Sequence, residues 1–231
     1  TYLIDPFGRF NDDANYIIKS DYKSFCNEII TNSKSVTSSS TLEKFIKLEE
    51  QINKQLSDEN IMKLECEDNL ISSLFNNHNK IDNIFIGNSK LVRSLDNRMP
   101  THCNKIKVFS NRGASGIDGI VSTGLGLSVT NNEKNNLILL GDLSLYHDMN
   151  GLLAASRYNF KTTILVVNNN GGGIFNSLDI AKFNIPQFKE YWKTPHDIDF
   201  KKVSSLYECN YFLAETIKDV AELINKSFDI K

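Results

Sequence analysis

The sequence has little cysteine, little net charge and no long apolar run, and each shortage argues against a class of protein. The four cysteines lie far apart and form no CxxC pair, which disfavours a zinc site or a disulfide framework and favours reduced thiols. A net charge of −2 over 231 residues gives no support for nucleic-acid binding. Because no apolar stretch approaches the ~20 residues that span a bilayer, we expect no membrane partner either.

The composition that remains is that of an ordinary soluble globular protein. It is 40% hydrophobic and 23% charged, which is enough for one good core and a smaller element. The chain opens at Thr1 on a strand-like segment and closes at Lys231, where we expect a further strand after a helix. We therefore interpret it as a piece of a longer protein, so the lack of a targeting signal carries no information.

Two short apolar runs in the middle of the chain predict buried strands. Leu137–Leu140 and Thr162–Val167 are rich in branched side chains and contain no charged residue. Such runs are typical of strands covered on both faces, as in a parallel sheet. Between them, Tyr146–Tyr158 has apolar residues at helical spacing. The stretch is therefore predicted to be a strand–helix–strand crossover.

That crossover places polar groups from both strand ends at one edge of the sheet. A helix of about 13 residues covers ~20 Å, and six strand residues cover about the same distance on the way back. Asp142 and Asn169, 27 positions apart, should meet past the carboxyl ends of the strands, where open α/β sheets bind ligands. With the Gly171 carbonyl they offer the oxygen ligands that Mg²⁺ prefers, so we predict a metal–diphosphate site. Taken singly, "GDLS" could be a helix N-cap and "NNNGG" a turn.

The rest of the chain alternates strands with helices, which predicts a doubly wound parallel sheet flanked by helices. We divide the chain into residues 1–33, 34–57 with a linker and helix, and a main domain at 58–231. Further strands are predicted at 2–4, 83–87, 106–110 and 210–214. Helices are predicted before residue 33, between 42 and 77 with a break near Ser57, at 91–95, from the turn after 119 to about 129, at 200–207 and at 217–227. Residues 170–194 are predicted to form a loop.

Two more strand ends carry polar clusters, "GNSKLVR" at 87–93 and "SNRGASGIDG" at 110–119. Arg112 lies between a strand and a glycine-rich turn, which favours anion binding, whereas Arg93 fits a solvated helix face equally well. "GLGLS" at 124–128 lies inside a helical pattern, so we reject it as a dinucleotide fingerprint. His147 and Asp148 could form an acid–base pair, but residues of a first helical turn are the better interpretation.

These motifs resemble those of a known family. "GD" followed some 26 residues later by "NN" resembles the motif with which thiamine-diphosphate-dependent enzymes hold Mg²⁺ or Mn²⁺ and their cofactor. The resemblance implies Asp142, Asn169 and the Gly171 carbonyl as metal ligands, although Leu143 stands where the motif usually has glycine. "GDLS", "SNRGASGID", "GNSxxxR" and "NNNGGGIF" are similar to one branch, the 2-succinyl-5-enolpyruvyl-6-hydroxy-3-cyclohexene-1-carboxylate synthases of menaquinone and phylloquinone biosynthesis. The opening "YLIDPFGRFND" is similar to the end of that family's central domain.

The resemblance implies an activity and roles for particular residues. Synthases of this branch are transferases that decarboxylate 2-oxoglutarate and add the four-carbon unit to isochorismate. The implied fold is the family's diphosphate-binding domain, preceded by the tail of the central domain and truncated at its C-terminal end. The implied catalytic residues are Ser89, Arg112 and Ile174; the implied substrate-binding residues are Ser89, Arg93, Arg112, Ile174 and Phe175; and the implied cofactor-binding residues are Ser115, Gly116, Ile117, Gly141, Asp142, Leu143, Ser144, Asn169, Gly171, Gly172 and Ile174.

The resemblance also implies what this chain needs from elsewhere. The family's activating glutamate lies in a pyrimidine-binding domain that is absent here and that a neighbouring subunit normally supplies, so we expect a homodimer or homotetramer and an inactive isolated chain. The implied location is the cytoplasm or a plastid stroma. Three alternatives stay open: an acetolactate synthase-like 2-oxoacid enzyme, a non-catalytic binding remnant and, more distantly, a Rossmann dehydrogenase.

Overall fold

The computed structural model describes residues 1–9, 13–33, 40–56, 66–77, 80–99, 105–158, 160–183 and 185–230. The chain divides into two compact units, Thr1–Ile61 and Met62–Lys231. The helix break predicted near Ser57 lies outside the described residues.

The first unit contains two short parallel strands, β1 (Tyr2–Ile4) and β2 (Tyr16–Ile18), and two helices, α1 (Tyr22–Asn32) and α2 (Ser40–Leu56). The predicted strand at 2–4 and the helix that follows are confirmed, whereas β2 was not predicted. Asp21 begins α1 as its N-cap, because its side chain accepts a hydrogen bond from the Ser24 backbone N–H at 2.9 Å.

The second unit is built on a parallel sheet, as the sequence predicts. Its four strands are β3 (Asn83–Ile86), β4 (Lys107–Phe109), β5 (Asn136–Gly141) and β6 (Thr162–Val167), in the order β4-β3-β5-β6. All three pairings are parallel. The chain moves outward from β3 to β4 and then returns to the other side of β3, so the strand order reverses between β3 and β5. Ligands of open α/β sheets bind at such a reversal point.

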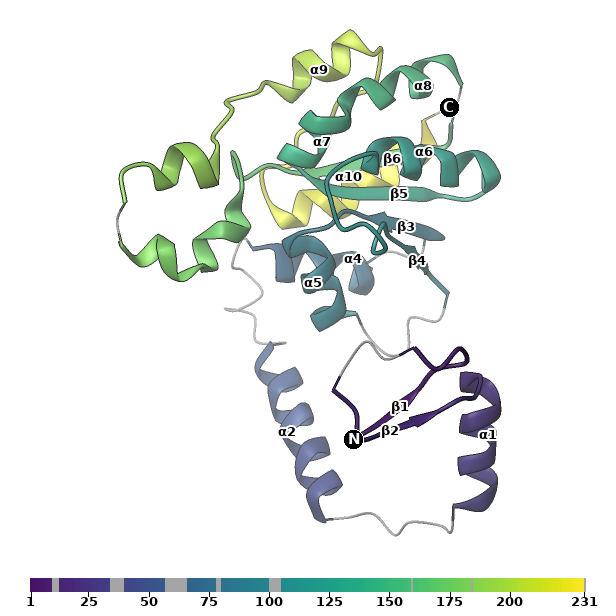
Figure 1. The fold of residues 1–231 in the computed structure, drawn as a ribbon. Helices are drawn as coiled ribbons and strands as arrows, with labels where there is room; N and C mark the ends of the chain where they lie inside the picture. Colours follow the sequence, from purple (N-terminus) through teal and green to yellow (C-terminus); the bar gives the residue numbers. More distant parts are fainter. Residues whose placement is uncertain are drawn as a thin grey trace. The chain divides into compact units, whose positions relative to one another are not determined.

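Helices cover both faces of this sheet (Figure 1). Ile84 and Ile86 pack with α4 (Glu67–Asn77), α5 (Lys90–Arg98) and α10 (Ile217–Asp229), whereas Phe85 packs with α6 (Ile120–Thr130), α7 (Asp142–Asp148), α8 (Leu152–Arg157) and α9 (Phe200–Leu206). The change of face from one residue to the next is the two-residue period of a strand. No helix in the described ranges is long and apolar enough to traverse a bilayer.

Two predictions about the second half of the chain are corrected. The predicted strand at 210–214 is wrong, because these residues belong to no strand ladder. Their alternation reflects side-chain packing instead: Ala214 packs against the core and the Phe212 ring lies 5.2 Å from the Lys226 ammonium. The segment predicted as a loop at 170–194 contains three short helices, η2 (Gly173–Ser177), η3 (Asp179–Phe183) and η4 (Lys189–Lys193).

The predicted crossover helix is present but begins earlier than expected and is broken. It runs as α7, a 3₁₀ turn η1 (Met149–Gly151) and α8. His147 and Asp148 therefore end α7 and do not lie in a first turn. Asp148 accepts hydrogen bonds from the backbone N–H and the hydroxyl of Ser122, at 2.8 and 3.2 Å, and His147 lies 3.6 Å from Asp118. The two side chains thus contact different partners, so an acid–base pair is not formed.

Candidate functional site

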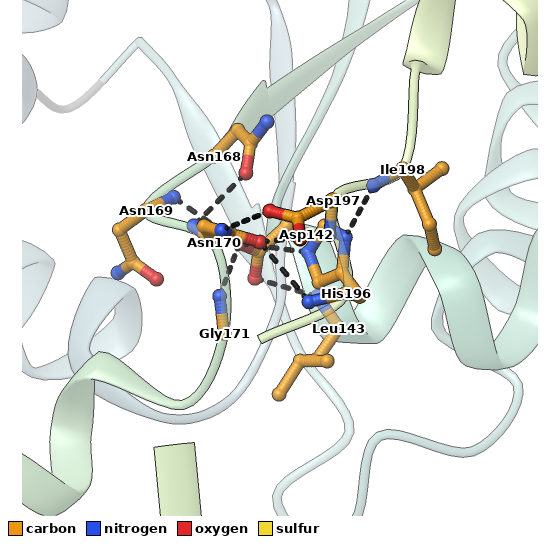
Figure 2. A network of polar contacts seen from close by, with 9 residues as sticks. All are labelled: Asp142, Leu143, Asn168, Asn169, Asn170, Gly171, His196, Asp197 and Ile198. Carbon is orange, nitrogen blue, oxygen red and sulfur yellow. Dashed lines mark hydrogen bonds and ion pairs between the residues drawn. The ribbon is translucent and has the colours of Figure 1, made fainter. Parts of the chain in front are cut away.

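The carboxylate of Asp142 is the centre of the candidate site. Asp142 follows β5 as the first residue of α7 and is only 2% exposed. Its Oδ2 atom accepts hydrogen bonds from the backbone N–H groups of Asn169 and Gly171, at 3.1 and 2.9 Å, and Oδ1 accepts one from Leu143 at 2.6 Å (Figure 2). The structure thus brings the ends of β5 and β6 together, where the sequence spacing placed them. Backbone amides, which the sequence did not point to, make the contact.

The loop after β6 is held in a backbone conformation that depends on its residue types. Gly171 has a φ of 129°, and a Cβ atom there would lie 2.1 Å from the Lys193 carbonyl oxygen. Asn170 has a φ of 57°, in the left-handed region that asparagine tolerates better than most residues. The Gly172 N–H donates to the Lys193 carbonyl at 2.7 Å. The loop therefore lies tightly against the end of η4.

Asn170 fastens this loop to residues 196 and 197. Its Oδ1 accepts hydrogen bonds from the backbone N–H groups of His196 and Asp197, each at 3.0 Å, and its Nδ2 donates to the Asp197 carboxylate at 2.7 Å. His196 in turn reaches the Asp142 carboxylate, with 3.3 Å between Nε2 and Oδ2. Neither Asn170 nor His196 was predicted as a site residue. The third asparagine of "NNNGG" was the only signal in the sequence, through the tolerance of asparagine for positive φ.

A second cluster forms where β3 ends, around the buried side chain of Asn88. Its Nδ2 donates hydrogen bonds to the carbonyls of Asn111 and Gly116, at 3.2 and 2.7 Å. Its Oδ1 accepts one from Arg112 Nη1 at 2.8 Å. One buried amide therefore ties the "NRGASG" loop to the end of β3 and orients its arginine, a role that the sequence did not reveal.

Ser89 follows Asn88 in a strained backbone conformation. Its φ is 74° and its ψ is −135°, a region that residues other than glycine rarely adopt. Such positions cost about 1–3 kcal/mol and cluster at functional sites. The Arg93 guanidinium donates to the Ser89 carbonyl and is otherwise exposed, so Arg93 lies at the same strand end as Ser89.

The remaining predicted residues lie in the same segments. Gly141 ends β5 as the N-cap of α7, and Ser144 is buried in that helix. Ile117 packs beside the core between the sheet and α6. Ile174 and Phe175 belong to η2, and Phe175 is 37% exposed. The Ser115 hydroxyl donates to the Arg112 carbonyl at 3.3 Å.

The oxygen atoms of the Asp142 cluster fit a divalent cation. Asp142 Oδ1 and the Gly171 carbonyl each accept one hydrogen bond, from Leu143 and from Gly173, which leaves a lone pair on each oxygen. The Asn169 side chain is exposed and makes no hydrogen bond with the described residues. No group of three His, Cys, Asp or Glu residues that could hold a metal ion occurs in the described part of the chain. One carboxylate with neutral oxygens suits Mg²⁺ completed by phosphate oxygens.

Comparisons with known proteins relate the chain to one enzyme family. The family described as "Thiamine pyrophosphate enzyme, C-terminal TPP binding domain" matches residues 95–231. The 2-succinyl-5-enolpyruvyl-6-hydroxy-3-cyclohexene-1-carboxylate synthases of Oceanobacillus iheyensis and Enterococcus faecalis are each 43% identical to this chain, over 147 and 141 residues. These matches cover 64% and 61% of this chain but only 25% and 24% of the synthases, so the match spans about a quarter of their length.

The solved structures show the same fold at much lower identity. Benzoylformate decarboxylase from Polynucleobacter necessarius superposes with a TM-score of 0.57 at 16% identity, over 74% of this chain and 32% of the decarboxylase. At that identity, the likeness supports the fold and nothing finer.

Proposed function

The chain belongs to the thiamine pyrophosphate enzymes, whose C-terminal cofactor-binding domain it carries, and we propose that it is part of a 2-succinyl-5-enolpyruvyl-6-hydroxy-3-cyclohexene-1-carboxylate synthase. The identity of about 43% to two such synthases supports this choice within the family. The proposed reaction is the decarboxylation of 2-oxoglutarate and the addition of the resulting four-carbon unit to isochorismate.

One observation carries the cofactor part of the proposal: the buried Asp142 carboxylate is held by the backbone N–H groups of Asn169 and Gly171 beside the strand-order reversal. We propose Asp142 Oδ1, the Asn169 side-chain oxygen and the Gly171 carbonyl as ligands of Mg²⁺ or Mn²⁺. The metal would then hold the diphosphate of the cofactor. Because the amides already fix the carboxylate, little reorganisation is needed when the cation binds.

The substrates of the proposed reaction carry carboxylates, and the second cluster offers the cations to bind them. Among the described residues, Asn88 orients the Arg112 guanidinium with a single hydrogen bond, and the other donors of the guanidinium are available for a planar carboxylate. Arg93 is the second candidate, beside the strained Ser89. Phe175 and Ile174 supply an apolar wall that would exclude water from the reacting centre.

Bound thiamine diphosphate supplies the electron sink that allows a 2-oxo acid to lose carbon dioxide. The residues of this chain would hold the diphosphate through a metal, bind the substrate carboxylates and keep the site apolar. We propose that a glutamate outside this chain, in the pyrimidine-binding domain of a neighbouring subunit, completes the site. That arrangement requires at least a homodimer.

The intact protein, supplied with thiamine diphosphate and Mg²⁺, tests the proposal in a substrate comparison. With 2-oxoglutarate and isochorismate we expect release of carbon dioxide and formation of the joined product. Mass spectrometry detects that product. Pyruvate and benzoylformate, which lack the second carboxylate, should be used far less well. A preference for pyruvate would point to an acetolactate synthase-like enzyme. No turnover of any 2-oxo acid, with the glutamate-bearing domain present and the cofactor bound, would indicate a non-catalytic remnant.

A further inference from the structure

His196 is a buried side chain at the candidate site that has no part in the proposed chemistry so far. Its side chain is 8% exposed, although the residue lies in an irregular segment between η4 and α9. Its Nδ1 atom accepts a hydrogen bond from the Ile198 backbone N–H at 3.0 Å. An accepting Nδ1 carries no proton, so the neutral imidazole carries its proton on Nε2.

The Nε2–H donor of His196 faces the Asp142 carboxylate. Nε2 lies 3.3 Å from Oδ2, but the two groups are not well aligned, and among the described residues Nε2 has no aligned hydrogen-bond acceptor. A buried donor without an acceptor lowers the stability of the fold. The location of this donor beside the buried carboxylate of Asp142 therefore needs an explanation.

The surrounding chain holds the imidazole in this position. The Asn170 side chain accepts hydrogen bonds from the backbone N–H groups of His196 and Asp197. The Phe200 ring packs edge-on against the imidazole, with 5.7 Å between the ring centroids. Asn170 belongs to the same loop whose amides bind Asp142, so the loop, the histidine and the carboxylate form one connected unit (Figure 2).

We propose that His196 is a positioning residue that orients the Asp142 carboxylate for a divalent cation. On this view, the two loop amides occupy Oδ2. The positive end of the Nε2–H bond faces the same oxygen at 3.3 Å and keeps the carboxylate plane from turning, which leaves Oδ1 to bind the cation. Partners of metal-binding carboxylates typically contribute 10–100-fold to metal affinity. The inference rests on the proposed metal–diphosphate function of Asp142.

Two substitutions at this position separate the contact with Asp142 from the contact with Ile198. In His196→Gln the side-chain amide can donate from near the place of Nε2, whereas in His196→Asn the amide oxygen can accept from Ile198 near the place of Nδ1. Both variants lose the ring and its packing on Phe200. The intact wild-type protein and both variants are titrated with Mn²⁺ in the presence of thiamine diphosphate, and free Mn²⁺ is followed by electron paramagnetic resonance. His147→Ala, an exposed histidine of α7, is the matched control.

We expect His196→Gln to bind Mn²⁺ within about threefold of wild type and His196→Asn to bind it at least about tenfold more weakly. His147→Ala should bind it as wild type does. Equal affinity in the Gln and Asn variants, or weaker binding in the Gln variant, would overturn the positioning role. If wild type itself binds no Mn²⁺ with the cofactor, the proposed function fails instead.

A measurement on the wild-type protein requires no substitution. The ¹⁵N spectrum should show the His196 imidazole protonated at Nε2 and not at Nδ1. Addition of Mg²⁺ and thiamine diphosphate should shift the Nε2 resonance, because the carboxylate beside it then shares its charge with the cation. A proton on Nδ1, or an Nε2 resonance that stays unchanged while the cofactor binds, would contradict the proposal.

Discussion

At the scale of single residues, the side chains of two asparagines and one histidine support the candidate site. They lie beside the groups that the sequence points to, but the sequence did not single them out. Asn88 orients Arg112, Asn170 fixes the loop after β6, and His196 faces Asp142. Each contacts groups that are far away in sequence, and such contacts follow no period. The spacing of strand ends predicted Asp142 and Asn169, but it could not predict which buried amides hold them.

The first residue-scale prediction concerns Arg112. Arg112→Ala should lower the substrate efficiency for 2-oxoglutarate by about 30-fold or more, because losing a charge-assisted contact to a buried carboxylate costs roughly 2–5 kcal/mol. Affinity for thiamine diphosphate should barely change. Arg112→Lys keeps the charge without the planar fork and should recover part of the loss. Steady-state kinetics and cofactor titrations measure both, with Arg157→Ala, an exposed arginine at the end of α8, as the control. Unchanged 2-oxoglutarate kinetics in both Arg112 variants would remove Arg112 from the substrate site.

The second residue-scale prediction concerns pH and the first unit. A hydrogen bond from the Arg9 side chain is the main cause that lowers the pKa of Asp5 from 3.8 to about 2. Because the folded pKa is the lower one, the stabilisation is complete about one pH unit above 3.8 and is lost as the pH falls through about 2. Carboxyl ¹³C titration by NMR should place the Asp5 midpoint near that value. Arg9→Gln should return it toward 3.8, and an unchanged midpoint would exclude the Arg9 contact as the cause.

At the scale of elements, the pattern of apolar residues predicted the strands of the parallel sheet well. The central strands β3 and β5 are short apolar runs buried on both faces, whereas the edge strands β4 and β6 are less buried. The same reasoning failed at 210–214, where alternating burial arises from packing against the core and α10, without a ladder partner. It also missed the short helices after Gly172, since five-residue turns have no room to display a period. "GLGLS" lies inside α6, as predicted.

The two glycines of α6 allow an element-scale prediction. A Cβ atom on Gly124 would lie 2.7 Å from Ile138 Cδ1 of β5, whereas the space around Gly126 is open. Gly124→Ala should lower the free energy of unfolding by about 1–2 kcal/mol through overpacking. Gly126→Ala should raise it by up to about 1 kcal/mol, because alanine favours the helix. Urea unfolding of both variants measures the two changes, and shifts of the same sign would show that α6 does not pack on β5 through Gly124.

At the scale of the whole molecule, we propose that the chain holds one side of a shared site. We predict that the chain, purified alone, folds as a parallel α/β domain yet releases no carbon dioxide from 2-oxoglutarate. Circular dichroism and a melting curve check the fold, and a coupled assay measures turnover. Turnover by the isolated chain would mean that a carboxylate within it replaces the external glutamate. Asp118 would then be the candidate, because Asp148 is already bound to Ser122.

The central claim is that the ends of β5 and β6 form a metal–diphosphate site, and a crystal structure of the intact protein with thiamine diphosphate and Mn²⁺ tests it most directly. Anomalous scattering locates the manganese without reference to the protein chain. The account predicts a peak about 2.1–2.2 Å from Asp142 Oδ1, the Asn169 side-chain oxygen and the Gly171 carbonyl, with two diphosphate oxygens and a water completing the octahedral shell. A manganese peak away from Asp142, or bound thiamine diphosphate at another edge of the sheet, would contradict it.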